Sequence, residues 1–373
     1  MKTSDRHNGD IFGEYKPSET ALNVNDGVEQ PPVVNPYISG IIKKKKGSMS
    51  VDAYMDGIVS GDRVILSKAI TLVESSLPED REIAGQLILK CLEYSKRMES
   101  KRIGITGVPG AGKSTFIEAF GNLVTEKGHN VAVLAIDPSS ERSKGSILGD
   151  KTRMETLCNN PKAFIRPSPS AGSLGGVARK TRETILLCEA AGFDVIFIET
   201  VGVGQSETAV HSMSDFFLLL MISGAGDDLQ GIKRGIMEMS DMIAINKADG
   251  NNIDKANMAR ALYSNALHLF PPTGSGWTPV AITISSIEKT GLEETYGKIE
   301  EYFRLIISNG YYMQRRREQD RYWMYESIDN SLKEMFYENE TVKKLIPEYE
   351  AAVLEGKIDS FSAASELLDK YRR

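Results

Sequence analysis

The sequence predicts an α/β fold with a mostly parallel central sheet and helices on both faces. Short apolar runs alternate with helical stretches between residues 100 and 308, as in strands joined by crossover helices. Some runs, such as Val195–Ile198, are apolar throughout, which is typical of strands buried on both faces. The expected strands are Arg102–Thr106, Asn130–Ile136, Ala163–Pro167, Asp194–Glu199, Phe216–Ile222, Met242–Asn246 and Val280–Ser285.

Composition sets broad limits on the kind of protein. The chain has 373 residues, of which 41% are hydrophobic and 26% charged, with a net charge of −6. This balance suits a globular protein with one large domain and smaller additions, and gives no electrostatic case for a nucleic-acid partner. The three cysteines form no C-x-x-C pair, and no apolar run is long enough to cross a membrane. The polar N-terminus lacks a signal or transit pattern, so we expect a cytoplasmic protein.

Composition and the spacing of apolar residues divide the chain into four segments. Residues 1–49 are rich in Pro, Gly, Asn and Asp and are expected to form a flexible tail. Residues 50–99 carry apolar residues at helical spacing and predict a small helical unit, with one helix starting at Pro78. Residues 100–308 form the α/β domain. Residues 309–373 predict amphipathic helices without strands, which either cap the main domain or pair with a second copy, and pairing is favoured.

The first strand ends in a glycine-rich turn, Gly107-Val108-Pro109-Gly110-Ala111-Gly112-Lys113-Ser114, that fits G-x-x-x-x-G-K-[ST] at every fixed position. Glycines let backbone N–H groups surround phosphate oxygens, and the following helix adds positive charge at its N-terminus. The lysine is expected to bridge the β- and γ-phosphates and the serine to bind Mg²⁺. The motif therefore predicts a P-loop nucleoside triphosphatase, with Gly107, Gly110, Ala111, Gly112, Lys113, Ser114 and Thr115 around the phosphates.

A second motif, Asn246-Lys247-Ala248-Asp249, follows a later apolar strand and has the form N-K-x-D. The Asp249 carboxylate can accept hydrogen bonds from both N1–H and the N2 amino group of guanine. Adenine offers no such pair of donors and would leave this acceptor unpaired. Lys247 can lay its stem over the base, and Ser285, Ser286 and Ile287 follow the last strand where their N–H groups can meet the guanine carbonyl. The predicted ligands are GTP and GDP.

Acidic residues at other strand ends are candidates for the hydrolytic chemistry. Asp137 follows the second strand, where it can hold a Mg²⁺-bound water or orient the attacking water; alternatively it caps a helix or turn. Glu199 begins Glu199-Thr200-Val201-Gly202, where G proteins usually have D-x-x-G, so Glu199 is expected to reach Mg²⁺ through water and Gly202 to meet the γ-phosphate. Asp150 would reach the metal only on loop closure. A role for Gln205 in positioning water is left open.

Several longer strings resemble the methylmalonyl-CoA mutase-associated GTPases. This family contains bacterial mutase chaperones and mitochondrial cobalamin-A relatives, formerly named arginine or lysine/ornithine transport ATPases. The resemblance covers the chain from about Val51 onward. Its most specific parts are the block Gly145–Met154 and the string Glu199–Glu207, which add to Gly107–Thr115, Asp137–Ser140 and Asn246–Asp249.

The resemblance implies a homodimeric G protein of the signal-recognition/MinD-like (SIMIBI) class. Such proteins bind an adenosylcobalamin-dependent acyl-CoA mutase, gate cofactor delivery with GTP, and protect or reactivate the mutase. It also implies a first switch over Asp137–Arg153, a second from Glu199, and a third mobile segment near Gly224–Lys233. In this family the C-terminal helices form the dimer contact.

Two other functions stay open from the residues alone. A metal-insertion GTPase would carry a Cys/His ligand cluster, which the sequence lacks. A metabolite kinase or transport-associated NTPase would carry an acceptor pocket and a positioned base, and N-K-x-D is unusual there. Whether the γ-phosphate goes to water or to a small molecule discriminates between a GTPase and a kinase.

Overall fold

The structure is a computed structural model that describes residues 49–75, 77–95, 99–136, 154–167, 174–200, 206–224 and 234–372. Almost all of the predicted N-terminal tail lies outside these ranges. Among the described residues no helix is long and apolar enough to span a membrane.

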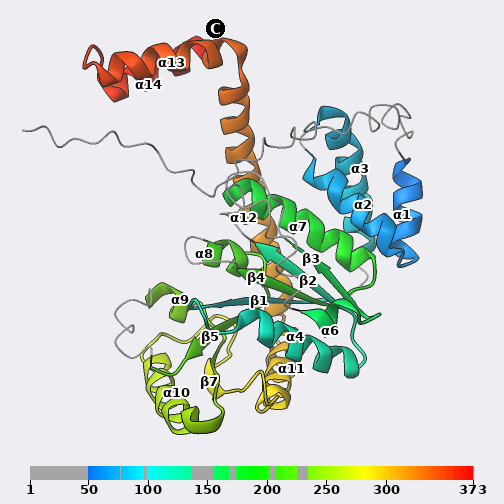
Figure 1. Ribbon diagram of the computed structural model, residues 1–373. Coiled ribbons are helices and arrows are strands. Elements are labelled where there is room, and N and C mark those ends of the chain that lie inside the picture. Colours follow the sequence, from blue (N-terminus) through cyan, green and yellow to red (C-terminus); the bar gives the residue numbers. More distant parts are fainter. Residues whose placement is uncertain are drawn as a thin grey trace, which may run out of the picture. The chain divides into compact units, whose positions relative to one another are not determined.

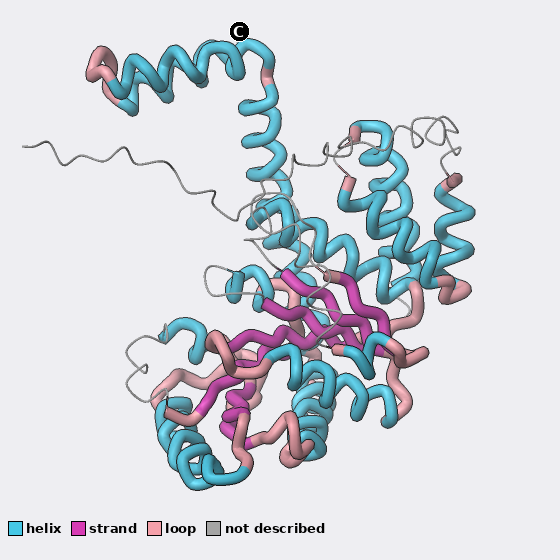
Figure 2. The backbone as a smooth tube through the Cα atoms, in the orientation of Figure 1, coloured by secondary structure: helices cyan, strands magenta, loops and turns pink. Residues whose placement is uncertain are grey.

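The described strands form a single sheet (Figure 2), with the order β3-β2-β4-β1-β5-β6-β7. Every neighbouring pair is parallel. Helices follow the strands in turn, so the predicted α/β fold is confirmed. The strands are β1 Lys101–Gly107, β2 Val131–Ile136, β3 Ala163–Arg166, β4 Val195–Thr200, β5 Phe216–Ile222, β6 Met242–Asn246 and β7 Val280–Thr283.

Alternate residues of the central strands face two different cores. In β4, Val195 and Phe197 belong to the core with α4 Lys113–Glu126, α6 Glu155–Cys158 and α11 Leu292–Ser308. Ile196 and Ile198 point to the opposite face, covered by α7 Leu174–Ala190 and α8 Ser206–His211 (Figure 1). Both faces are thus apolar, as the continuous apolar runs predicted.

The N-terminal helices extend the second of these cores. They are α1 Val51–Val59, α2 Arg63–Glu74 and α3 Pro78–Ser95. Ser50 and Asp62 cap the first two, because their side chains accept hydrogen bonds from backbone N–H groups of the first turn. Ile58, Ile70 and Leu87 are fully buried within the core that contains α7.

A third core covers the other end of the sheet. Leu219 and Met221 of β5 pack there with Ile243 and Ile245 of β6. The helices on this side are α9 Arg234–Glu238 and α10 Ile253–Leu267, which follows the 3-10 turn η2 Gly250–Asn252. This core supports the strand that carries the N-K-x-D motif.

The C-terminal region is helical, with α12 Tyr311–Glu338, α13 Glu340–Leu354 and α14 Ser360–Tyr371. Polar contacts bind the first half of α12 to the main domain: Arg316 pairs with buried Asp215 at 2.7 Å, and the Trp323 indole donates to the Ser212 carbonyl at 3.2 Å. In the second half of α12 and in the next two helices, many apolar side chains are exposed, including Leu332, Met335, Leu354 and Phe361.

Five of the seven predicted strands differ from the observed bounds by one or two residues at an end. The last helix begins at Ser360, where Asp359 caps it through the N–H groups of Phe361 and Ser362. The last strand ends at Thr283 rather than Ser285, because Ser285 turns back and forms an isolated bridge with Thr290.

Candidate functional site

The glycine-rich turn joins the carboxyl end of β1 to the start of α4, in the centre of the sheet. A Cβ on Gly107 would lie 2.3 Å from the Leu220 carbonyl oxygen of β5, so a larger residue would displace the strand. Gly112 has φ +85°, which L side chains rarely adopt, and α4 begins at the next residue. The first backbone N–H groups of a helix have no acceptor within the helix, so those at this helix start can donate to an anion.

Lys113 lies back along the turn, where its Nζ donates to the Gly107 carbonyl at 3.0 Å. Burial lowers the pKa of Lys113, and the nearby charges of Glu199 and Glu207 oppose that shift. The ammonium group is therefore partly desolvated beside two carboxylates, where a phosphate can gain from its charge. Sequence reasoning gave Glu207 no role of its own, although it ends the string Glu199–Glu207 that carries part of the family resemblance.

Ser114 and Glu199 meet at the same position. The Ser114 hydroxyl donates to Glu199 Oε1 at 3.5 Å, and Glu199 is almost fully buried at the end of β4. β4 lies directly beside β1, whereas β2 does not, since β4 separates them. The carboxylate nearest to the P-loop among the described strand ends is thus the one carried by β4. Thr115, the third predicted residue of this helix start, is exposed.

Asn246 connects the P-loop to the N-K-x-D segment. Its Nδ2 donates to the Ala111 carbonyl at 2.8 Å, although the two residues are 135 positions apart. Its Oδ1 accepts from the Ser286 backbone N–H at 3.2 Å and from the Ser286 hydroxyl at 2.9 Å. The side chain is buried, so one amide holds three loops at the carboxyl edge of the sheet.

Asp249 lies beside the loop after β7. The buried Ser285 hydroxyl donates to Asp249 Oδ2 at 2.6 Å, and a carboxylate can accept hydrogen bonds from further donors. Ile287 is 76% exposed and is available to an entering base. The structure therefore brings together the predicted base-reading residues Asn246, Lys247, Asp249, Ser285, Ser286 and Ile287 next to the P-loop.

Other predicted site residues lie outside the described ranges. They are Asp137, Asp150, Gly202 and Gln205, and the third mobile segment is described only at Gly224. Their roles stay predictions from the sequence.

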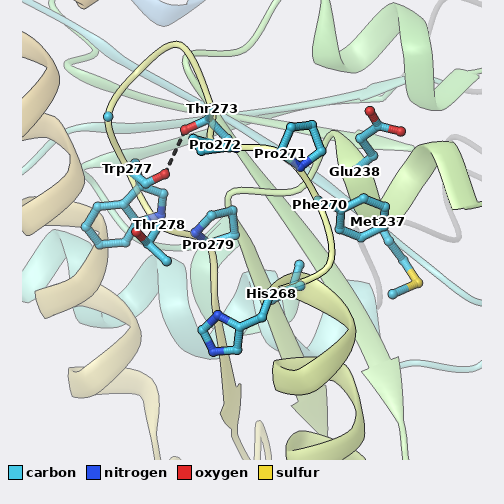
Figure 3. Close-up of a pocket in the computed structure, with 12 residues that line it drawn as sticks. Met237, Glu238, His268, Phe270, Pro271, Pro272, Thr273, Trp277, Thr278 and Pro279 are labelled. Carbon is cyan, nitrogen blue, oxygen red and sulfur yellow. Dashed lines mark hydrogen bonds between the residues drawn. The ribbon is translucent and has the colours of Figure 1, made fainter.

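Two hollows among the described residues lie at the amino ends of the strands, on the edge away from the P-loop. The smaller has a volume of about 190 Å³ and is lined by the end of α10 and the segment that follows it (Figure 3). There the Thr273 hydroxyl donates to the Trp277 carbonyl at 2.7 Å, and the Trp277 indole donates to the Asp241 carbonyl at the start of β6. The larger lies between α3, α7 and α12 and includes Arg102 at the start of β1. Neither hollow adjoins the position where a γ-phosphate would lie.

The described part of the chain holds no cluster of three or more His, Cys, Asp or Glu side chains suited to a metal ion. The oxygen pair formed by Ser114 and Glu199 is nevertheless compatible with Mg²⁺, which keeps most of its water and takes its remaining ligands from phosphates and one or two protein oxygens.

Comparison with protein families identifies a match over residues 66–341 to the family described as methylmalonyl Co-A mutase-associated GTPase MeaB. A putative GTPase of Caulobacter vibrioides is 50% identical over 321 residues, covering 86% of this chain and 98% of the relative. The methylmalonic aciduria type A homolog of Mus musculus, a mitochondrial protein, is 44% identical over 330 residues, covering 86% of this chain and 80% of the relative.

A solved structure shows the same fold. The crystal structure of an LAO/AO transport system kinase superposes with a TM-score of 0.67 at 35% sequence identity. It covers 87% of this chain and 98% of its own.

Proposed function

Because the chain belongs to the family of methylmalonyl Co-A mutase-associated GTPases, we propose that it is a GTP-driven chaperone of an adenosylcobalamin-dependent acyl-CoA mutase. The chain is a GTPase, as its relatives are. The proposed client is methylmalonyl-CoA mutase or a related enzyme. In this role GTP binding and hydrolysis gate delivery of the cobalamin cofactor and protect or reactivate the mutase.

One observation carries the nucleotide part of the proposal, namely that Asn246 hydrogen-bonds both the P-loop and the loop after β7. These contacts support the proposal that the phosphate-binding turn and the base-reading carboxylate belong to one site. The Asp249 carboxylate accepts hydrogen bonds and therefore favours guanine, which offers two donors. Adenine would leave this partly buried carboxylate unpaired. The mutase part is supported by the family description and by the name of the mouse relative.

The proposed roles follow from charge and position. Lys113 stabilises the negative charge that develops on the β- and γ-phosphates as water attacks and GDP leaves. The Ser114 hydroxyl and, through water, Glu199 would hold Mg²⁺, which neutralises phosphate charge when bound. The glycine turn orients the phosphates through its backbone N–H groups. Asp137, Asp150 and Gly202 complete the proposed site from the sequence pattern.

We also propose that α12, α13 and α14 form a homodimer contact. Along these helices several large apolar side chains are more than half exposed, among them Leu332, Met335, Leu354 and Phe361. A surface of this kind gains stability when a second copy covers it. Leu354→Glu combined with Phe361→Glu is expected to reduce the mass in light scattering from dimer to monomer. A monomeric wild-type protein would contradict this contact.

A pull-down with purified methylmalonyl-CoA mutase, under GDP and under a non-hydrolysable GTP analogue, tests the function. The proposal expects binding that differs between the two nucleotide states. Absence of binding in both states would remove the mutase as client. A parallel assay follows the γ-phosphate of GTP, and its transfer to an amino acid such as arginine instead of water would favour a metabolite kinase.

A further inference from the structure

Lys247, within the base-reading motif, has an unfavourable backbone conformation. Its φ is +60°, in the left-handed region that residues with a side chain rarely adopt. The residue follows the end of β6 directly and precedes Ala248, whose N–H donates to the Ile284 carbonyl at 3.0 Å. A conformation of this kind persists only where surrounding contacts hold it.

Asn252 supplies such a contact from the 3-10 turn η2. Its Nδ2 donates to the Lys247 carbonyl at 2.6 Å, and its backbone N–H donates to the Asp249 carbonyl at 2.9 Å. One residue thus holds the motif at two of its four positions. Its own side chain is partly buried.

Ser223 fixes the orientation of the Asn252 amide. The Ser223 hydroxyl donates to Asn252 Oδ1 at 2.6 Å, which leaves Nδ2 of the same amide directed at Lys247. Ser223 lies immediately after β5, and β5 pairs with the P-loop strand β1 on one side and with β6 on the other. The Ser223–Asn252 pair therefore connects the end of the strand beside the P-loop to the base-reading turn.

We propose that Ser223 and Asn252 are positioning residues for guanine recognition. They hold Lys247 in its left-handed conformation, so that its side-chain stem covers one face of the base while Asp249 reads the edge. The proposal rests on the proposed guanine site and adds two residues to it that the N-K-x-D motif does not contain. Because neither residue is placed at the phosphates, their loss weakens retention of the base and leaves phosphate binding intact.

The test compares Ser223→Ala and Asn252→Ala with Asn251→Ala, a neighbouring asparagine that is exposed. Dissociation of fluorescent mant-GDP is expected to be about five-fold faster in each of the first two variants, the effect of one neutral hydrogen bond. The double variant should be little faster than either single variant, because both changes remove the same support. Ser223→Thr retains the hydroxyl and is expected to restore slow dissociation. Asn251→Ala should behave as the wild type.

Binding of inorganic tripolyphosphate separates positioning of the base from a general loss of structure. Its affinity should stay unchanged in Ser223→Ala and Asn252→Ala, since it contacts the P-loop only. Wild-type GDP dissociation in both variants would overturn the proposal, as would an equal loss of GDP and tripolyphosphate affinity. If Asp249→Asn leaves the preference for guanosine over xanthosine nucleotides unchanged in competition titrations, the guanine site itself fails. If Asp249→Asn shifts the base preference as expected, while GDP dissociates from Ser223→Ala and Asn252→Ala at the wild-type rate, only the positioning role is refuted.

Discussion

Removal of the Asn246 amide should weaken both the fold and the nucleotide site. In Asn246→Ala three hydrogen bonds disappear, to the Ala111 carbonyl, the Ser286 N–H and the Ser286 hydroxyl. At about 1 kcal/mol net for each, the free energy of unfolding should fall by about 3 kcal/mol. This figure is a lower bound. Asn246 is 2% exposed, so water hardly reaches the Ala111 and Ser286 groups that lose their partner.

The same change should reduce affinity for GDP about ten-fold, or ~1.4 kcal/mol. The Ala111–Gly112 turn rests against the Asn246 amide, since a Cβ added to Gly112 would lie 3.0 Å from Nδ2. Without this contact the phosphate-binding turn and the base-reading loops are no longer held together, and part of the binding energy is used to order them.

Urea unfolding and an equilibrium titration with mant-GDP measure the two quantities. Asn246→Asp serves as a matched variant, because it retains an acceptor for Ser286 but has no donor for Ala111. We expect it to lose GDP affinity at least as strongly as Asn246→Ala. Wild-type GDP affinity in Asn246→Ala, together with a loss of less than about 1 kcal/mol in unfolding free energy, would refute the bridging role.

Three further predictions concern the base, the phosphates and His211 of helix α8. Asp249→Asn should shift preference from guanosine towards xanthosine nucleotides, and competition titrations with unchanged GTP selectivity would reject base reading by this carboxylate. Lys113→Ala should abolish hydrolysis and weaken triphosphate binding by more than about 1 kcal/mol; phosphate release at the wild-type rate would show that the lysine is dispensable. Burial and the Arg315 charge lower the pKa of His211 to about 3, so the folded protein holds it neutral while the unfolded chain protonates it near pH 6.5. The contribution of His211 to the free energy of unfolding is therefore fully present above about pH 6.5 and is lost as pH falls. Between pH 7.5 and pH 5 the loss is about 2 kcal/mol. Asp241 opposes this trend, because burial raises its pKa to about 6. The difference in urea unfolding between wild type and His211→Gln isolates the histidine, and equal pH profiles would contradict its neutral state.

The sequence predicted those features that depend on local pattern. The P-loop is recognisable because its glycines, lysine and serine have fixed spacing between a strand and a helix. The N-K-x-D motif follows a strand for the same reason, and the seven strands could be placed from their apolar runs. Fold class and family therefore follow from the amino-acid sequence alone.

Contacts between distant segments could not be predicted from local sequence pattern. Nothing in the spacing of Ala111 and Asn246 indicates that one amide joins them, since this depends on the order of β1, β5 and β6 in the sheet. The position of β4 beside β1 likewise determines which acidic strand end meets Ser114. The left-handed Lys247 gave no sequence signal either, because lysine is an unusual residue at positive φ.

The rate of GTP hydrolysis with and without purified methylmalonyl-CoA mutase tests the proposed switch most directly. We expect slow release of inorganic phosphate from the protein alone and a clear acceleration when the mutase is added in its cobalamin-free form. Lys113→Ala serves as the negative control in the same assay. A rate that the mutase leaves unchanged, with no difference in mutase binding between the GDP and GTP-analogue states, would contradict a GTP-driven chaperone of this enzyme.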